Sequence, residues 1–181
     1  MPYLISFVIG FIGSLLASVI FLFFILQYLR PTIKISDYIA YFEDLNNKDE
    51  YRYYFKFVNW SIHSAFDVRV RVCELIRWPA ENGKLHEQRK DLSLRTSFLA
   101  HVPKFKKTNS ESHNLATHAV VITCLDDLKP ILKDRNKCIE IQIILRHGLT
   151  GLGKVFKHEY SESSKVKSGM FDLGNKLTIK E

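Results

Sequence analysis

Two hydrophobic patterns divide the chain. From Leu4 to Leu29 the side chains are apolar almost without interruption, with Gln27 as the only strongly polar member. A helix of these 26 residues is roughly 39 Å long at about 1.5 Å per residue, against about 30 Å of bilayer hydrocarbon. Beyond Pro31, apolar residues alternate with polar ones, as in half-buried β-strands. The sequence therefore predicts a transmembrane helix in residues 1–30 and a mainly β domain in residues 31–181.

The alternation is clearest in three runs of the predicted β domain. Their inward positions are Tyr51, Tyr53, Phe55 and Phe57, then Phe66, Val68, Val70, Val72 and Ile76, then Ile139, Ile141, Ile143 and Leu145. Weaker alternation predicts strands at Ile33–Tyr41, Leu92–Leu99, Leu115–Cys124, Val155–Tyr160 and Phe171–Ile179. Asn82-Gly83 predicts a hairpin turn, and residues 126–135 predict a helix that Pro130 keeps short. Eight or nine short strands are typical of a β-sandwich, with a small β-barrel as the alternative.

The apolar segment is interpreted as an uncleaved signal anchor. The alternative, a secretory signal peptide, begins with a basic region and has an apolar stretch of roughly 7–15 residues. Here no charged side chain precedes Arg30, and Tyr3 and Tyr28 stand at the two ends, where headgroups favour such rings. Arg30 and Lys34 follow the segment. The positive-inside rule then predicts an outside N-terminus and a cytoplasmic C-terminal domain. We expect the membrane to be the inner membrane of a bacterium.

The thiols and one tripeptide bear on the same prediction. Cys73, Cys124 and Cys138 are far apart in apolar runs, which favours buried reduced thiols and agrees with a cytoplasmic domain. Asn59-Trp60-Ser61 matches a glycosylation acceptor, which a cytoplasmic location would make irrelevant.

Small residues recur within the predicted membrane helix. They are Gly10, Gly13, Ser14, Ala17 and Ser18, and several of them stand four residues apart. Small residues at this spacing allow two membrane helices to approach closely. The alternative is that such residues are simply common in membrane helices. We expect this face to support a homo-oligomer, without which a single span could not enclose a pore.

All charged side chains lie beyond residue 29, so the predicted β domain carries the whole formal net charge of +7. Arg69, Arg71 and Arg77 share the outward face of one predicted strand, and Lys104, Lys106 and Lys107 lie in a polar segment that predicts a loop. This basic face suits the anionic lipids of the inner leaflet, at about 1 kcal/mol per residue near the surface. An anionic ligand such as a nucleotide, or a cytoplasmic protein, is the alternative partner.

The sequence predicts no catalytic site, no cofactor and no metal site. Gly148, Gly153 and Lys154 match part of a phosphate-binding loop, but Val155 stands where a hydroxyl is needed and the residues that follow alternate like a strand. The histidines show no metal-ligand spacing, and no pair of cysteines is closely spaced. The acidic pair Asp126-Asp127 is interpreted as favouring the start of the short helix.

The segment Tyr54–Arg77, YFKFVNWSIHSAFDVRVRVCELIR, resembles the opening strands of the immunoglobulin-like cytoplasmic domain of inward-rectifier potassium channels. Phe57-Val58-Asn59 corresponds to a strand end of that family, and Ala65–Arg69 corresponds to the strand that follows. The resemblance implies an immunoglobulin-like β-sandwich. It does not imply ion conduction, because the sequence has no second span, pore helix or selectivity filter.

The sequence therefore predicts a single-pass, membrane-anchored interaction or sensor module that is not an enzyme. The alternative is a membrane effector, whose β domain binds an anionic nucleotide and changes the assembly of the helices. Small bacterial antiphage effectors are similar to it in organisation, since they combine membrane helices with a β-rich cytoplasmic domain that binds a cyclic nucleotide.

Overall fold

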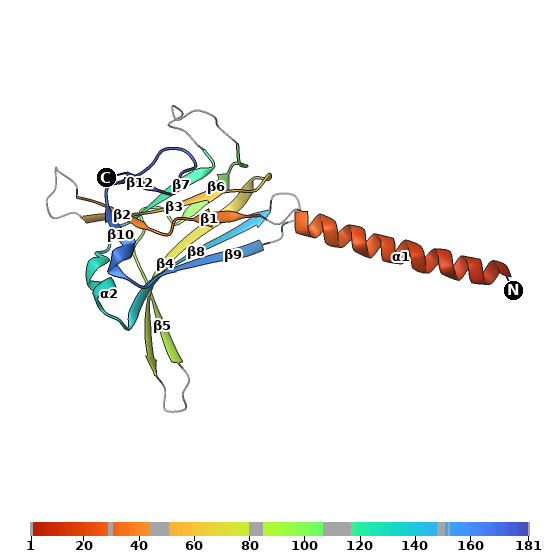
Figure 1. Ribbon diagram of the computed structural model, residues 1–181, viewed down its shortest axis with the longest axis horizontal. Helices are drawn as coiled ribbons and strands as arrows, with labels where there is room; N and C mark the ends of the chain where they lie inside the picture. Colours follow the sequence, from red (N-terminus) through yellow and green to blue (C-terminus); the bar gives the residue numbers. More distant parts are fainter. Residues whose placement is uncertain are drawn as a thin grey trace. The chain divides into compact units, whose positions relative to one another are not determined.

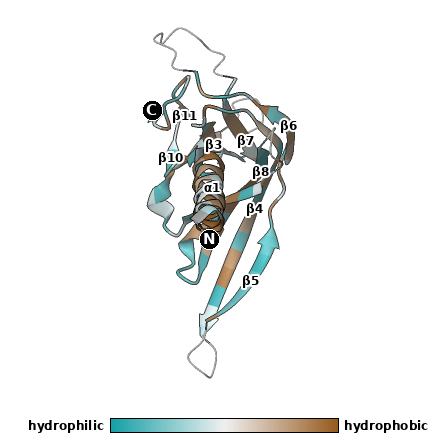
Figure 2. Ribbon diagram, turned by 90° about the vertical axis from the view of Figure 1, so that its right-hand side faces the viewer, coloured by the Kyte–Doolittle hydropathy of each residue, from teal (hydrophilic) through white to brown (hydrophobic). Residues whose placement is uncertain are grey.

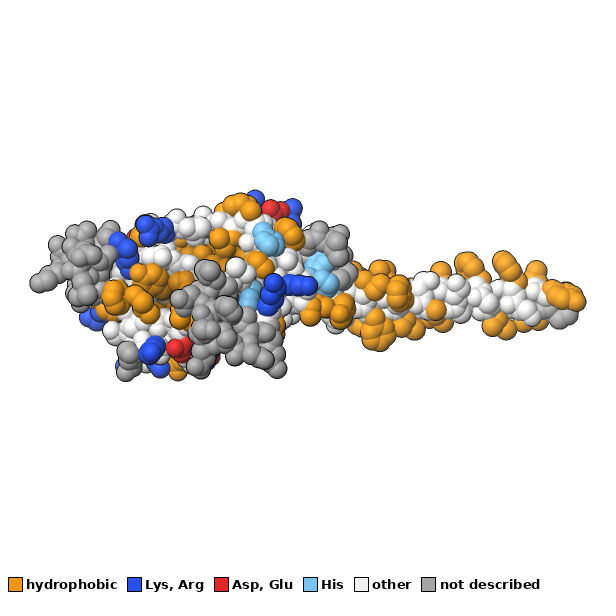
Figure 3. All heavy atoms as spheres, turned by 90° about the horizontal axis from the view of Figure 1, so that it is seen from above, with side chains coloured by type: hydrophobic (Ala, Val, Ile, Leu, Met, Phe, Trp, Pro, Cys, Tyr) orange, Lys and Arg blue, Asp and Glu red, His pale blue; other side chains and the backbone are white. Residues whose placement is uncertain are grey.

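The computed structural model describes residues 2–28, 31–43, 51–79, 85–106, 117–147, 151 and 153–180 (Figure 1). The chain divides into two compact units, Met1–Arg30 and Pro31–Glu181. The first is a single helix, α1 (Pro2–Tyr28), with no acidic residue in its first turn and no basic residue in its last. Among the described residues, it is the one helix long and apolar enough to cross a membrane, as an anchor or a signal sequence would be. Figure 2 shows its hydrophobic character, and Figure 3 shows its exposed apolar side chains.

The second unit contains two five-stranded sheets, of which the first is built around β3 (Tyr51–Asn59). One edge of β3 pairs with β7 (Ala119–Cys124), and the other pairs with β1 (Ile33–Ile35) and then β2 (Ile39–Glu43), all antiparallel. The short strand β10 (Val166–Ser168) adds to β2 in parallel. The predicted strand Ile33–Tyr41 is thus broken, because the Ser36 hydroxyl accepts the Tyr38 N–H at 3.2 Å and turns the chain between β1 and β2.

The second sheet is built around β4 (Ala65–Pro79). One edge of β4 pairs with β8 (Lys137–His147), which in turn pairs with β9 (Gly153–Tyr160). The other edge pairs first with β6 (Phe98–Val102) and then with β5 (Leu85–Asp91). Figure 1 shows β4 and β5 continuing beyond the rest of the sheet as a two-stranded arm. The predicted Asn82-Gly83 turn lies outside the described residues.

The remaining elements are short. The predicted helix in residues 126–135 is confirmed as α2 (Lys129–Lys133), with Pro130 in its first turn, where a missing N–H costs no hydrogen bond. The predicted strand Phe171–Ile179 is wrong: β11 (Met170–Phe171) and β12 (Ile179–Lys180) are two short strands joined by a turn. The predicted strand Leu92–Leu99 is also wrong, since β6 begins at Phe98. A single 3-10 turn, η1 (Ser163–Lys165), precedes β10.

Both sheets contribute to one hydrophobic core. The first supplies fully buried Tyr53, Phe55 and Phe57, and the second supplies Ile139, Ile141, Ile143 and Leu145. The Tyr160 hydroxyl links them by donating to the Ser36 carbonyl at 2.6 Å. The described domain has twelve strands, of which eight have five residues or more. The prediction of an N-terminal apolar helix followed by a mainly β domain is confirmed.

One predicted inward position of β4 is wrong. Phe66 is 41% exposed, because the register slips between Phe66 and Arg69 at a bulge where Asp67 has a φ of 48°. Val68, Val70 and Val72, beyond the bulge, are buried as predicted. Trp78, near the end of β4, is 42% exposed and stacks on His86 with ring centroids 5.8 Å apart.

Candidate functional site

The predicted basic residues of β4 lie on a face that also carries carboxylates. Arg71 makes a bidentate ion pair with Asp91 of β5, with Nε–Oδ1 at 2.7 Å and Nη2–Oδ2 at 2.9 Å. Hydrogen bonding from Arg71 lowers the pKa of the Asp91 carboxyl. Arg77 contacts Glu87 at 3.0 Å and Glu159 at 2.9 Å. Two of the three arginines are thus neutralised by carboxylates on β5 and β9.

The carboxylates on this face continue across the sheet. Arg89 of β5 contacts Glu87 at 3.4 Å and the nearly buried Glu140 of β8 at 3.7 Å. Arg69 is exposed, and no ion pair to it is found among the described residues. The face has mixed charge. The sequence analysis did not indicate its acidic half, because Glu87 and Asp91 come from β5, which hydrophobicity does not reveal, and Glu159 comes from β9, far along the chain.

The predicted lysines lie elsewhere, at the end of the domain where the chain enters it. Lys104 and Lys106 are exposed in the segment that follows β6, and Lys107 lies outside the described residues. Ala65 at the start of β4 pairs with Val102 at the end of β6. Asn59 at the end of β3 pairs with Ile33, two residues beyond Pro31. The structure therefore does not bring the lysines and Arg77 together, because twelve residues of β4, roughly 40 Å of extended chain, separate Ala65 from Arg77.

An aromatic cluster lies at this same end. Trp60 is 40% exposed, and its ring lies 4.3 Å from that of Phe105 and 3.9 Å from the Lys34 ammonium. Its backbone N–H donates to the Thr32 carbonyl at 2.8 Å, and the Phe105 N–H donates to the Ser61 carbonyl at 2.9 Å. We call Lys34, Trp60, Ile62 and residues 104–106 the Trp60 end. The sequence indicated its lysines but not that an exposed tryptophan stands among these residues.

The side chain of Asn59 fixes the loop of the Trp60 end. It is fully buried, and its amide donates to the carbonyls of His63, Val102 and Pro103 at 3.1, 3.3 and 2.9 Å. Its Oδ1 accepts the backbone N–H of Ser61 at 3.1 Å. The side-chain amide is buried, and both its nitrogen and its oxygen are hydrogen-bonded. It is therefore not accessible as a glycosylation acceptor in the folded domain.

The five small residues of α1 lie within one arc of the helix surface, since successive residues turn by about 100°. Gly10 and Gly13 have open space where a Cβ would stand. The Ser18 hydroxyl donates to the Ser14 carbonyl at 2.9 Å, so it is satisfied within its own helix. Association of α1 with a second copy stays a prediction.

The segment around Gly153 and Lys154 does not have the structure of a phosphate-binding loop. The residues from Gly153 form β9, so no helix N-terminus follows. Residues 148–150 and 152 lie outside the described residues.

The three cysteines are free and buried as predicted, and burial raises the pKa of the Cys124 thiol to about 11. No group of three or more metal-ligating side chains is found among the described residues.

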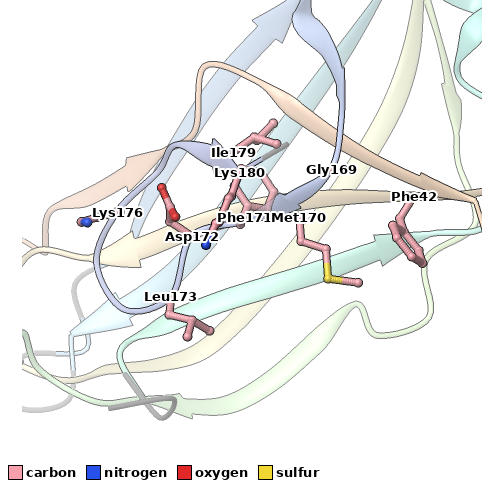
Figure 4. Close-up of a pocket in the computed structure, with 9 residues that line it drawn as sticks. All are labelled: Phe42, Gly169, Met170, Phe171, Asp172, Leu173, Lys176, Ile179 and Lys180. Atoms are coloured by element: carbon pink, nitrogen blue, oxygen red, sulfur yellow. The ribbon is translucent and has the colours of Figure 1, made fainter. Parts of the chain in front are cut away.

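The C-terminal segment forms a hollow and covers a lysine. The hollow has a volume of about 850 Å³, and all its lining residues except Phe42 belong to residues 169–180 (Figure 4). Gly169, with a φ of 122°, is required there because a Cβ would meet the Lys180 carbonyl oxygen at 2.3 Å. Beneath this segment Lys56 of β3 is buried and donates to the Asp172 carbonyl at 2.5 Å. Burial lowers the pKa of Lys56 to about 8, against a smaller opposing effect of Asp172.

Comparison with known proteins adds no family. No family model and no curated protein matches the chain. Among solved structures, the X-ray structure of Northeast Structural Genomics Consortium target SoR45 aligns with 74% of this chain and 86% of that one, at 13% identity and a TM-score of 0.29. A likeness of this extent carries no argument about function, which therefore depends on the geometry of the chain itself.

Proposed function

We propose that the protein is a single-pass, membrane-anchored interaction or sensor module and not an enzyme. In this proposal α1 is an uncleaved anchor with its N-terminus outside, and the β domain is an immunoglobulin-like sandwich in the cytoplasm. One observation carries the proposal. The large apolar side chains of α1 are 44–89% exposed from Tyr3 to Phe24, on every side of the helix, while the β domain has a complete core of its own.

The cost of exposing those side chains to water favours a bilayer around α1. Burial of one large apolar side chain is worth about 1.5–3 kcal/mol, and α1 exposes such residues over its whole length. A helix that is apolar on all sides is expected either in the core of a large protein or in a membrane. None of the apolar window of α1 is buried in the described structure.

The ion pairs of the second sheet favour an interaction module over a nucleotide-binding effector. A nucleotide phosphate on Arg71 or Arg77 would have to displace a carboxylate that is already at 2.7–3.0 Å. Calorimetric titration tests this choice. The full-length protein in detergent micelles is titrated with cyclic and linear nucleotides, and the heat of binding is measured. Heat of binding that Arg69→Gln or Arg71→Gln abolishes would favour the effector.

We also propose that the small-residue face of α1 associates with a second copy. The support is the spacing of Gly10, Gly13, Ser14, Ala17 and Ser18, together with the space next to both glycines. The oligomer would place several β domains side by side at one membrane, which raises the local concentration of whatever surface they present.

Extraction of membranes from expressing cells tests the anchor. We expect the full chain to stay with the membrane in alkaline carbonate, to float with lipid in a density gradient and to keep its N-terminal helix by intact mass. A variant that lacks residues 2–28 should be soluble with the same β domain. Release of the full chain by carbonate, or a mature mass that lacks the helix, would contradict the proposal.

A further inference from the structure

The Trp60 end is the part of the β domain next to the membrane helix along the chain. Three peptide units join Tyr28 to Pro31, and at full extension they reach at most about 11 Å. The backbone N–H of Trp60 donates to the Thr32 carbonyl at 2.8 Å. Trp60 therefore stays beside the first residues of the β domain, whatever the orientation of that domain relative to α1. The headgroup region is roughly 5 to 8 Å thick on each side of the hydrocarbon. An inserted α1 therefore brings this end of the domain to the depth of the headgroups.

The residue types at the Trp60 end suit that environment. Trp60 and Ile62 are 40% and 51% exposed, which is unfavourable in water for rings and branched chains of this size. Lys34, Lys104 and Lys106 are exposed around them. Tryptophan favours the interface between hydrocarbon and headgroups, and lysine favours anionic headgroups. The combination matches an interfacial contact better than it matches a solvated loop.

The backbone holds this surface in one conformation. Asn59 ties together the carbonyls of His63, Val102 and Pro103, and the Phe105 N–H bonds to Ser61. Trp60 therefore does not need to be ordered when it meets a lipid, and the contact loses less conformational entropy than a flexible loop would.

We propose that the Trp60 end is a lipid-binding surface that inserts Trp60 and Ile62 among anionic headgroups and sets the orientation of the β domain on the membrane. This inference rests on the proposed function, because it requires α1 to span the bilayer. It assigns Lys34, Lys104 and Lys106 to lipid. It does not assign Arg77 to lipid, because roughly 40 Å of extended chain in β4 separates Arg77 from Ala65 at the Trp60 end.

The chain offers matched probes, because Trp60 and Trp78 are its only tryptophans. Trp78→Phe leaves Trp60 as the sole fluorophore, and Trp60→Phe leaves Trp78, near the end of β4, as the sole fluorophore. Each full-length variant is reconstituted into vesicles of phosphatidylcholine and phosphatidylglycerol that carry brominated lipid. We expect quenching of Trp60 to exceed that of Trp78 severalfold. Trp60 should also be shielded from aqueous acrylamide in vesicles but not in detergent.

Two further comparisons complete the test. Replacing phosphatidylglycerol by phosphatidylcholine, or introducing Lys104→Gln and Lys106→Gln beside Trp78→Phe, should reduce the quenching of Trp60. Equal quenching of the two tryptophans in vesicles that float with the protein would overturn the lipid surface and leave the anchor intact. Failure of the protein to float with the vesicles at all would instead overturn the proposed function.

Discussion

At the scale of single residues, Asn59 shows how much one amide can determine. Removing a side chain that donates to three carbonyls takes one hydrogen-bond donor away from each of them. We expect Asn59→Ala to lower the free energy of unfolding by about 2 to 4 kcal/mol, since each buried polar group without a partner costs about 1–3 kcal/mol. Ser61→Ala, which removes one hydroxyl from the same loop, should cost about 1 kcal/mol. Urea unfolding followed by tryptophan fluorescence measures both, and equal losses would contradict the central role of Asn59.

Lys56 predicts a pH dependence with a definite sign. Burial lowers its pKa in the folded state to about 8, against 10.5 for the free side chain. Between these two pH values, Lys56 binds a proton in the unfolded chain but not in the folded domain. The free energy of unfolding therefore rises as the pH increases from about 8 to 10.5, and it falls again as the pH decreases through this range. Lys56→Met has no such titration.

The measurement for Lys56 is the difference in unfolding free energy between wild type and Lys56→Met at pH 7 and pH 10. We expect wild type to gain about 1 to 2 kcal/mol relative to the variant over this interval. Ionisation of the buried cysteines and tyrosines acts in the opposite direction, but it is common to both proteins and cancels. Curves that stay parallel from pH 7 to pH 10 would contradict the burial of a titrating lysine.

At the scale of elements, the sequence predicts a strand where one face is buried and the other is exposed. β3 and β8 were predicted because their apolar residues meet the core at every second position. β5, LHEQRKD, was missed because all its residues are exposed, so its pairing with β4 leaves no trace in hydrophobicity. The burial of Lys56 could not be predicted either, because the segment that covers it lies more than a hundred residues away.

The same limit applies to the candidate sites. The sequence located the lysines of the 104–106 segment, because a charged loop is a local feature. It could not show that Arg71 and Arg77 are neutralised, since their carboxylate partners lie on β5 and β9. Nor could it place Trp60 beside Thr32, because the pairing of β1 with β3 brings these positions together across the fold.

Self-association of α1 can be tested by a substitution at one position. Gly13→Leu fills the space beside the helix backbone and should abolish most chemical crosslinking of the full-length protein in membranes. Val19→Leu is the matched control, because position 19 faces the opposite side of the helix. Crosslinking that survives Gly13→Leu, or that falls equally with Val19→Leu, would show that the small residues do not form the interface.

At the scale of the whole molecule, orientation relative to the membrane decides which partners the β domain can meet. Cysteine labelling can measure this orientation, because the native thiols should react slowly. Cys73, Cys124 and Cys138 are buried, and burial raises the pKa of each. A reactive cysteine introduced at an exposed position is therefore the only one that labels rapidly in the folded domain. Gln88 of β5 is exposed, neutral and on the arm far from the Trp60 end.

We expect a membrane-impermeant maleimide to label Gln88→Cys only after cells are permeabilised, since Arg30 and Lys34 favour a cytoplasmic domain. Tyr3→Cys, at the other end of α1, should label from outside intact cells. The two variants test one topology from opposite sides, so a failure of expression or of the reagent cannot imitate the expected pattern. Labelling of Gln88→Cys in intact cells would place the β domain outside. Its lysines would then face an outer leaflet, and the inner-leaflet role of the Trp60 end would fail with the orientation.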